Sequence, residues 1–217
     1  MSINLSPRNR LLLLLPALPF IVASQCVVLF SSGDSDDDDK DKEEDKIVVA
    51  TRTGNFANAP VEGMAYQSGP LKGVTGPGGE FSYVVDQPVQ FSLGDIELGS
   101  PVQGRAVLST VDLVPGGDDR SATVINIARL LGSLDATPGD DAITIPAAVL
   151  AAAVRDNPAI AAAIDHLDFE DETAFVNSAS QLVAVLTADY PHTATLMDAG
   201  TASEQLRQWQ TPVPAGD

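Results

Sequence analysis

The 217-residue chain has a single cysteine, Cys26, and two histidines, His166 and His192. A lone cysteine cannot form a disulfide bond within the chain, so the fold is held together without one. No thiol follows Cys26, which excludes a cysteine nucleophile from the body of the protein. With two imidazoles in the whole chain, a zinc site built on histidines is not expected either.

Positive charge is also scarce. The chain has 12 lysine and arginine residues against 30 aspartate and glutamate residues, which gives a formal net charge of −18 at pH 7. A surface of this sign repels phosphate backbones, so nucleic acid is not expected as a partner. The same surface attracts cations, including divalent ones, although an acidic coat that keeps the protein soluble explains the composition more simply.

The long hydrophobic run, Leu11–Phe30, follows a short segment that carries two arginines. A positive start, an apolar run and an acidic sequel predict that residues 1–32 are an export signal. Three outcomes stay open: cleavage near Ser31–Gly33, retention as a single membrane anchor, or lipid attachment at Cys26. Gln25, directly before the cysteine, departs from the usual lipoprotein signal. All three outcomes place the rest of the chain outside the cytoplasm.

Residues 33–58 are predicted to be an acidic linker. Within them, Asp34–Lys46 holds nine acidic and three basic residues, a net charge of −6. Such a stretch repels itself and has no apolar surface to bury, which predicts a solvated spacer. Ile47-Val48-Val49 could add an edge strand to the sheet that follows.

Residues 59–114 predict a small antiparallel β-sandwich. Apolar and polar side chains alternate along Glu80–Val85 and Val89–Leu93, with the period of two that half-buried strands have. Turn residues such as Gly94-Asp95 separate the runs, and short strands with tight turns are typical of antiparallel sheets. Strands are expected at Val61–Gln67, Leu71–Thr75, Glu80–Val85, Val89–Leu93, Ile96–Leu98 and Arg105–Ser109.

Residues 120–212 have the period of a helix instead. Val124, Ile127 and Leu131 lie on one stripe. Ser121 is the expected N-cap of this helix. Further helices are expected from Pro146, from Pro158, after Asp168 or Asp171, and from Thr201 through Trp209, with residues 213–217 left as a tail. The predicted fold class is therefore α+β, a small antiparallel β-sandwich followed by an α-helical region packed on the sheet.

Several motifs occur together in the body of the chain. They are Val61/Gly63/Tyr66, Gly73-Val74-Thr75 with Gly79, Phe81 and Tyr83, Val89/Phe91/Leu93-Gly94 with Ile96 and Leu98-Gly99, Asp112-Leu113, and Asn126-Ile127-Ala128-Arg129-Leu130-Leu131. Over roughly residues 61–145 this arrangement resembles an uncharacterised family of exported lipoproteins and surface proteins of Gram-negative bacteria. Its strand half is similar to carboxypeptidase-regulatory or transthyretin-like β-sandwiches, which are non-catalytic, and an N-I-x-R-L-L helix follows. The resemblance implies a fold and a place in the cell envelope more than it implies an activity.

Asp135, Asp140 and Asp141 are the candidate metal ligands. Their carboxylates offer the oxygen donors that Ca²⁺ prefers, and members of the family that the chain resembles often carry an Asp-rich loop here. The middle aspartate and the Asn-Gly pair of that loop are missing in this chain. The alternative is that Asp135 lies at a helix end and Asp140-Asp141 forms a turn. Calcium is the one cofactor that the sequence suggests.

Two other polar groups have a structural and a functional interpretation. A buried bridge from Arg129 to a strand carboxylate, beside Asn126, is favoured over substrate binding. Asp165, His166 and Asp168 contain acid and base side chains, but no nucleophile or oxyanion donor accompanies them. A surface helix end explains those three residues better.

These features favour a non-enzymatic binding or structural module tethered in the cell envelope, in the periplasm or on the cell surface, with calcium as a stabiliser if the aspartates bind it. Its partner would be an envelope protein or a glycan, and it would contact the membrane only through an N-terminal lipid or anchor. The alternative is an accessory subunit of an envelope transport or solvent-tolerance system, which contacts partners through the alanine-rich stretch Pro146–Leu167. A hydrolase built around His166 is the least favoured hypothesis.

Overall fold

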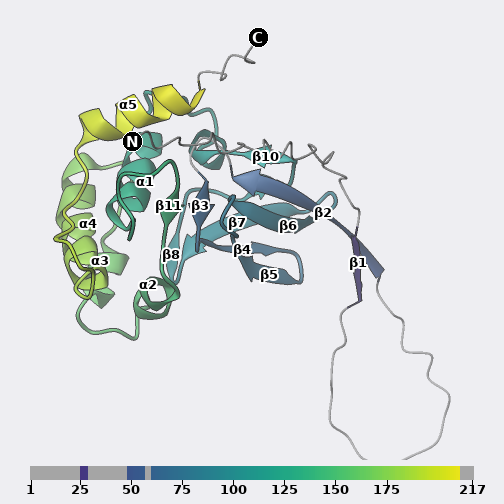
Figure 1. Ribbon diagram of the computed structural model, residues 1–217, viewed down its shortest axis with the longest axis horizontal. Coiled ribbons are helices and arrows are strands. Elements are labelled where there is room, and N and C mark those ends of the chain that lie inside the picture. The colour runs from purple at the N-terminus through teal and green to yellow at the C-terminus, as the bar shows by residue number, and fades with distance from the viewer. Residues whose placement is uncertain (1–24, 29–47, 57–59, 211–217) are drawn as a thin grey trace, which may run out of the picture.

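The computed structural model describes residues 25–28, 48–56 and 60–210. Figure 1 shows that the strands lie on one side of the molecule and the helices on the other. The described part is an α+β fold, in which a β-sandwich-like set of short strands precedes the helices, as the sequence predicts.

The strands are mostly short. They are β1 (Gln25–Val28), β2 (Val48–Phe56), β3 (Val61–Glu62), β4 (Ala65–Ser68), β5 (Leu71–Val74), β6 (Glu80–Val84), β7 (Pro88–Leu93), β8 (Ile96–Glu97), β9 (Val102–Gln103), β10 (Val107–Leu108) and β11 (Ile143–Thr144). In the described part, one sheet is centred on β2, which pairs with β1, β6 and β10. A second has the order β5-β4-β7-β8, with β9 also on β7, and we call it the β7 sheet; β3 and β11 form a two-stranded sheet of their own. The pairs β2–β10 and β3–β11 are parallel, and the others are antiparallel.

Aromatic side chains fill the space between the two sheets. Phe56 and Phe81 come from the β2 sheet, and each ring lies edge-on to Phe91 of the β7 sheet, with centroids 5.1 and 5.2 Å apart. All three side chains are buried. Rings from opposite sheets can meet in this way only if the sheets face each other, so these contacts define the sandwich.

The predicted linker is too long at its C-terminal end. Residues 33–58 were expected to be a spacer with at most an edge strand, but residues 48–56 form β2, which has strands paired along its length. Thr51, Gly54 and Phe56 are buried, and Phe56 belongs to the core between the sheets. The acidic composition ends before this segment, so its side chains can be buried without desolvating a charge. The rest of the predicted linker lies outside the described residues.

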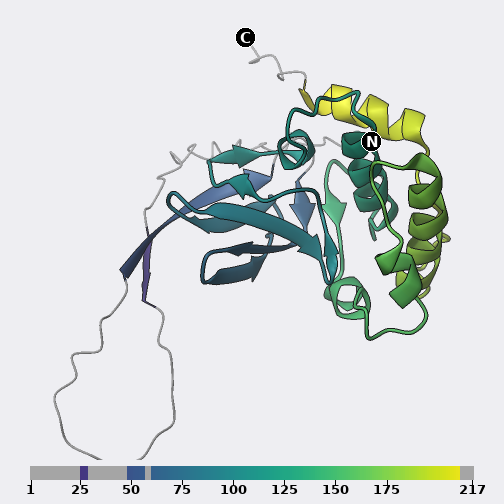
Figure 2. The same cartoon turned by 180° about the vertical axis from the view of Figure 1, so that it is seen from behind.

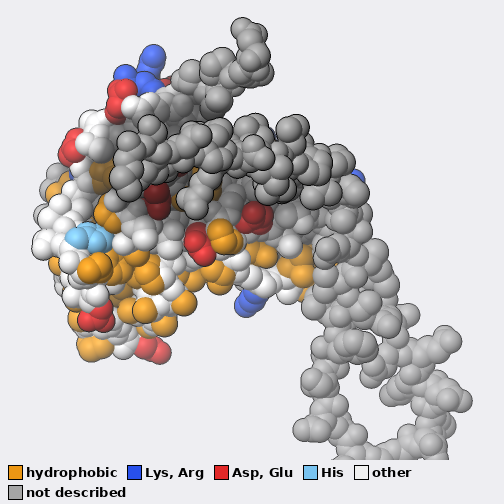
Figure 3. Space-filling view, in the orientation of Figure 1, with side chains coloured by type: hydrophobic (Ala, Val, Ile, Leu, Met, Phe, Trp, Pro, Cys, Tyr) orange, Lys and Arg blue, Asp and Glu red, His pale blue; other side chains and the backbone are white. Residues whose placement is uncertain are grey.

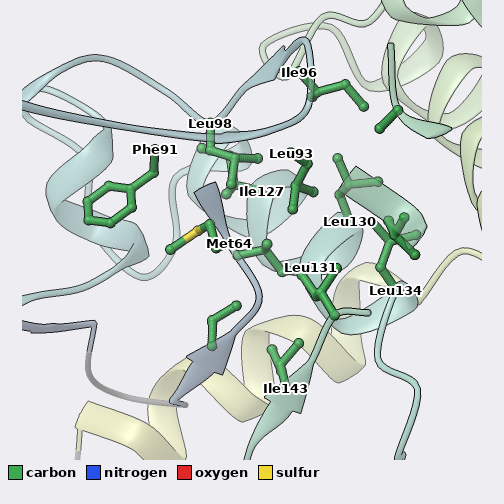
Figure 4. Close-up of a cluster of buried hydrophobic side chains, with 14 of the residues drawn as sticks. Met64, Phe91, Leu93, Ile96, Leu98, Ile127, Leu130, Leu131, Leu134 and Ile143 are labelled. Carbon is green, nitrogen blue, oxygen red and sulfur yellow. The ribbon is translucent and has the colours of Figure 1, made fainter. Parts of the chain in front are cut away.

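The helices follow the strands. They are the 3₁₀ helix η1 (Thr110–Leu113) and the α-helices α1 (Ala122–Ser133), α2 (Ala147–Ala152), α3 (Ala161–Asp165), α4 (Glu172–Leu186) and α5 (Ala199–Gln210). Figure 4 shows side chains of α1, such as Ile127 and Leu131, beside Met64, Leu93 and Leu98 from the strand half. The strands and helices therefore share one core. Seen from behind (Figure 2), α5 lies against α1.

The helix starts differ in how they are capped. Ser121 precedes α1 as predicted, but its hydroxyl donates to Asp118 Oδ1 at 2.9 Å and caps no helical N–H group. Asp171 caps α4 by accepting two first-turn N–H groups at 2.8 and 2.9 Å. The last helix begins two residues before the predicted start: Asp198 precedes it and accepts the N–H of Thr201 at 2.9 Å. The side chain of Trp209 lies outside the described residues.

Two close backbone contacts join the strand half to the helical half. Gly63 has φ of +87°, and a Cβ there would collide with the carbonyl of Ile145, which follows β11. Gly94 has φ of +56°, and a Cβ there would collide with the carbonyl of Ala153, which follows α2. Both positions therefore require glycine, for conformation and for space.

Candidate functional site

The described surface is hollowed beside β8. Three adjoining depressions, of about 390, 310 and 330 Å³, are all lined by Glu97. The first two share Asp95 and Arg155, and the last two share Leu167 and Phe169. Because each shares residues with the next, they form one continuous depression, which we call the β8 groove.

The β8 groove runs along a strand. One wall is the chain from Gly94 to Ser100. In two of the depressions it is faced by the segment 164–170, which runs from the end of α3 toward α4. At the Gly94 end, the groove opens onto the outer face of the β7 sheet, where Gln90 and Ser92 alternate with buried apolar side chains. It is therefore built at the junction of the two halves of the molecule.

β8 forms an edge of the β7 sheet within the described part of the chain. It pairs with β7, with Leu93 opposite Ile96 and Ser92 opposite Glu97. The N–H of Leu98 donates to Phe91 O at 3.0 Å, so the ladder continues by one residue. In antiparallel pairs, hydrogen-bonded and non-hydrogen-bonded positions alternate. The Glu97 N–H and C=O therefore point away from β7, toward the groove side of the strand.

Arg155 holds the end of the β7–β8 turn in place. Its N–H donates to Asp95 Oδ2 at 2.7 Å, and its guanidinium donates to Asp95 O at 3.3 Å and to Asp165 Oδ1 at 2.9 Å. The Asp95 N–H in turn donates to Ala153 O at 2.8 Å. These hydrogen bonds fix the position of β8 relative to the helical half.

The charges along the groove are mostly negative. Glu97 lies on one wall and Asp168 and Glu170 on the other, and all three side chains are exposed. Arg155 and Lys72 are near the opposite end, where Arg155 is paired with Asp165. The groove thus has an acidic end and an end of mixed charge, and Ile164, Leu167 and Phe169 provide its apolar surface.

A buried polar network surrounds Arg129 in the helical half. Its guanidinium donates to Met197 O at 2.8 Å, to Asn126 Oδ1 at 2.8 Å and to Glu172 Oε1 at 2.9 Å. It also lies 4.9 Å from the centre of the Phe175 ring. The predicted bridge to a strand carboxylate is wrong, because the carboxylate comes from the first turn of α4. Through these bonds Asn126 and Arg129 hold α1, α4 and the segment before α5 together.

Asp165, His166 and Asp168 have separate partners. Asp165 accepts from Arg155, and the Nδ1 of His166 lies 2.6 Å from Ala162 O. The Oδ1 of Asp168 accepts the N–H groups of the turn that leads into α4. All three side chains are exposed at the end of α3 and after it, which is the placement favoured from the sequence.

The three candidate calcium ligands do not converge. Among the described residues, no group of three or more His, Cys, Asp or Glu side chains could hold a metal ion. The Oδ1 of Asp135 accepts the N–H groups of Thr137 and Thr144, each at 3.0 Å. Asp140 accepts within its own turn, from the Ala142 N–H at 3.0 Å. These contacts agree with the alternative interpretation, a helix end and a turn, and the calcium prediction gains no support from the geometry.

Tyr190 lies near the same helix end. Its hydroxyl donates to Leu134 O, directly after α1, at 2.7 Å, and its ring contacts that of His192 with centroids 5.4 Å apart. Partial burial and, to a smaller extent, the negative charge of Asp135 raise the pKa of Tyr190 to about 12. The residue serves to close the end of α1.

The N-terminal predictions fall mostly on residues that are not described. Of the run Leu11–Phe30, residues 25–28 form β1, with Cys26 opposite Ala50 of β2. The side chain of Cys26 is not described, so its lipidation stays a prediction. Among the described residues, none of the helices has the length and apolar character needed to cross a membrane.

The alanine-rich stretch Pro146–Leu167 forms two short helices, α2 and α3, rather than a long one. Ala147, Ala148 and Ala162 are exposed on them. In Figure 3, hydrophobic side chains gather over the part of this face where Figure 1 places α2 and α3. Nothing in this surface distinguishes a transporter partner from any other, so the accessory-subunit alternative stays a prediction.

Sequence reasoning missed the β8 groove as a site, although it placed its parts. Glu97 stands between the apolar Ile96 and Leu98 after a Gly-Asp turn, a pattern that already indicates an outward-facing carboxylate on a short strand. No local pattern indicates that residues 164–170 lie opposite it. No family model, curated protein or solved structure matches the chain, so the family resemblance stays a prediction.

Proposed function

We propose that this chain is a non-enzymatic binding module of a Gram-negative cell envelope, and that the β8 groove receives an envelope partner. The observation that carries the proposal is the groove itself: of three depressions that share Glu97, two lie between β8 and the segment 164–170, and the third lies on the outer face of the β7 sheet. Grooves at the junction of two structural units are common binding sites.

Binding, rather than catalysis, is supported by how the reactive side chains are used. Asp165, His166 and Asp168 each contact a different group. General acid–base chemistry needs such groups to converge on one reacting atom. The groove instead offers carboxylates and amides along its walls and apolar side chains between them, which suits recognition of a surface.

An envelope location is supported by the sequence before the folded body. The apolar run Leu11–Phe30 follows a positive start, and the acidic run Asp34–Lys46 separates it from β2. Residues 25–28 of the apolar run pair with β2 as β1, so the acidic run would be a solvated, self-repelling stretch next to the body. The groove would then be presented to partners in the periplasm or at the cell surface.

The test is crosslinking in cells. A photo-crosslinking amino acid placed at Ser92, at the rim of the groove, is expected to capture a discrete envelope component from the full chain expressed in a Gram-negative bacterium. The Gln67→Arg substitution on the same rim is expected to reduce the capture severalfold, because it adds a bulky cation to the outer face of the β7 sheet. Cell fractionation in the same experiment measures the location.

The matched control is Asn177→Arg on α4, an exposed amide that lines none of the three depressions. It should leave capture unchanged. Fractionation of the full chain with cytosolic proteins would contradict the envelope location. Equal capture by the Gln67 and Asn177 variants would contradict the groove as the binding site.

A further inference from the structure

We propose that the occupant of the β8 groove is an extended peptide segment bearing lysine or arginine, which adds to the open edge of β8 as a further strand. This inference rests on the proposed function and names the class of its partner. It follows from the direction of the groove, the orientation of one main-chain residue and the charges of the two walls.

The groove has the shape that a strand requires. It follows the β8 edge from Asp95 to Ser100, with the segment 164–170 as the facing wall. An extended chain advances about 3.3 Å per residue, so a segment of about five residues would cover this length. A groove that crossed the strand would not align a peptide with its backbone, whereas this one runs beside it.

The backbone of Glu97 is oriented to accept such a segment. Because Ser92–Glu97 is a non-hydrogen-bonded pair, the Glu97 N–H and C=O both face away from β7. One residue of an added strand can bond both groups, which is the usual basis of strand addition at a sheet edge. The turn before β8 is held by Arg155, so the edge is already ordered before a partner arrives.

The charges select the sign of the peptide. Glu97, Asp168 and Glu170 present exposed carboxylates from both walls. An acidic segment would bring like charges together, whereas a lysine or arginine side chain would be attracted from either wall. Ile164, Leu167 and Phe169 would contact apolar side chains of the segment on the inner side of the groove.

The experiment measures fluorescence anisotropy of labelled five-residue peptides with the full chain purified in mild detergent. An alternating Lys-Val-Lys-Val-Lys peptide is expected to bind, and a Glu-Val-Glu-Val-Glu peptide is not. A fully N-methylated Lys-Val peptide, which cannot donate main-chain hydrogen bonds, is expected to bind about fivefold more weakly. Equal binding of the N-methylated peptide would overturn strand addition, and equal binding of the acidic peptide would overturn the charge preference.

Variants locate the contact. Glu97→Gln removes the charge and should weaken the Lys-Val peptide about threefold. Glu97→Pro removes both the charge and the outward N–H group, and an edge strand tolerates proline. This variant should weaken binding of the Lys-Val peptide further. Asp189→Asn, an exposed carboxylate outside the groove, should change nothing. If either Glu97 variant bound the Lys-Val peptide as tightly as the unaltered chain does, β8 would not be the binding site. Should Glu97→Pro fail to fold, the N-methylated peptide still tests the backbone contact.

The two proposals can fail separately. If crosslinking captures an envelope component through the groove but the Lys-Val peptide does not bind, the peptide inference falls and the binding module stands. If an oligosaccharide displaced the peptide at a concentration below that of the peptide, the groove would bind a glycan. That result would also overturn the peptide inference. If no groove-dependent capture occurs in cells, the proposed function fails, whatever the peptides do.

Discussion

The strand half and the helical half of this molecule are stabilised in different ways. In the strand half, Phe56, Phe81 and Phe91 meet between two sheets, and the contacts between the sheets that these rings make are apolar. In the helical half, a buried arginine joins α1 to α4 and to the segment before α5 through hydrogen bonds. A short strand contributes few side chains to the core, so each large aromatic ring supplies much of the apolar surface that the strand buries. The helices also bury apolar side chains such as Phe175 and Leu182, and the arginine adds hydrogen bonds between α1, α4 and the segment before α5.

The largest expected effect tests the aromatic contact. Phe91→Ala removes a fully buried ring that contacts both Phe56 and Phe81. We expect the free energy of unfolding to fall by about 3–5 kcal/mol, from lost burial and the cavity left behind. Urea denaturation followed by circular dichroism measures it. The control is Val74→Ala on β5, whose side chain is 55% exposed. If Val74→Ala lowered the free energy of unfolding as much as Phe91→Ala does, the rings would not be what holds the sheets together.

A smaller effect is expected from the polar network. Arg129→Met keeps most of the apolar volume but leaves Asn126 Oδ1 and Met197 O without their donor. Each unpaired buried acceptor costs about 1–3 kcal/mol, so we expect a loss of about 2–3 kcal/mol in the same measurement. Arg120→Met, at an exposed position, should stay within about 0.5 kcal/mol of the unaltered chain. Equal stability of the Arg129 variant would show that packing alone holds the helical half.

The contrast between the halves also explains how far sequence reasoning reached. Alternation in Val89–Leu93 gave the correct faces of β7, because side-chain direction in a strand is a local property. Asp171 was a correct N-cap candidate for the same reason. The partner of Arg129 was predicted wrongly, because Glu172 reaches it only through the packing of α4 on α1. The strand at Ile96–Leu98 was predicted, but the wall opposite Glu97 depends on long-range packing.

β2 shows a different limit. An acidic stretch precedes it, the short apolar run Ile47-Val48-Val49 leads into its first residues, and Thr51–Phe56 contains few apolar residues. Small side chains at Thr51 and Gly54 are buried there because β6 pairs along the same residues. A central strand of this composition is recognised only from its neighbours, since strand propensity depends on cross-strand packing.

A third prediction concerns how the helical half begins α4. Asp171→Ala removes the side chain that accepts two first-turn N–H groups. The expected loss is about 1 kcal/mol, a typical cost for an N-cap. Asp141→Ala, at an exposed turn position, is the control and should have no measurable effect. Thermal unfolding of both variants, followed at 222 nm, makes the comparison. An unchanged melting temperature for Asp171→Ala would mean that α4 is held by packing and by Arg129 rather than by its cap.

The smallest expected effect depends on pH and concerns the end of α1. Partial burial raises the pKa of Tyr190 to about 12, above the ordinary value of 10.0, so folding favours the protonated hydroxyl. The stabilisation is fully present below pH 10 and is lost as pH rises from 10 toward 12. We expect Tyr190→Phe to flatten part of the decline in unfolding free energy that the unaltered chain shows over this window. Because Tyr190 donates to Leu134 O, the phenylalanine variant should also be slightly less stable at neutral pH. An alkaline decline of Tyr190→Phe identical to that of the unaltered chain would place the titrating group elsewhere.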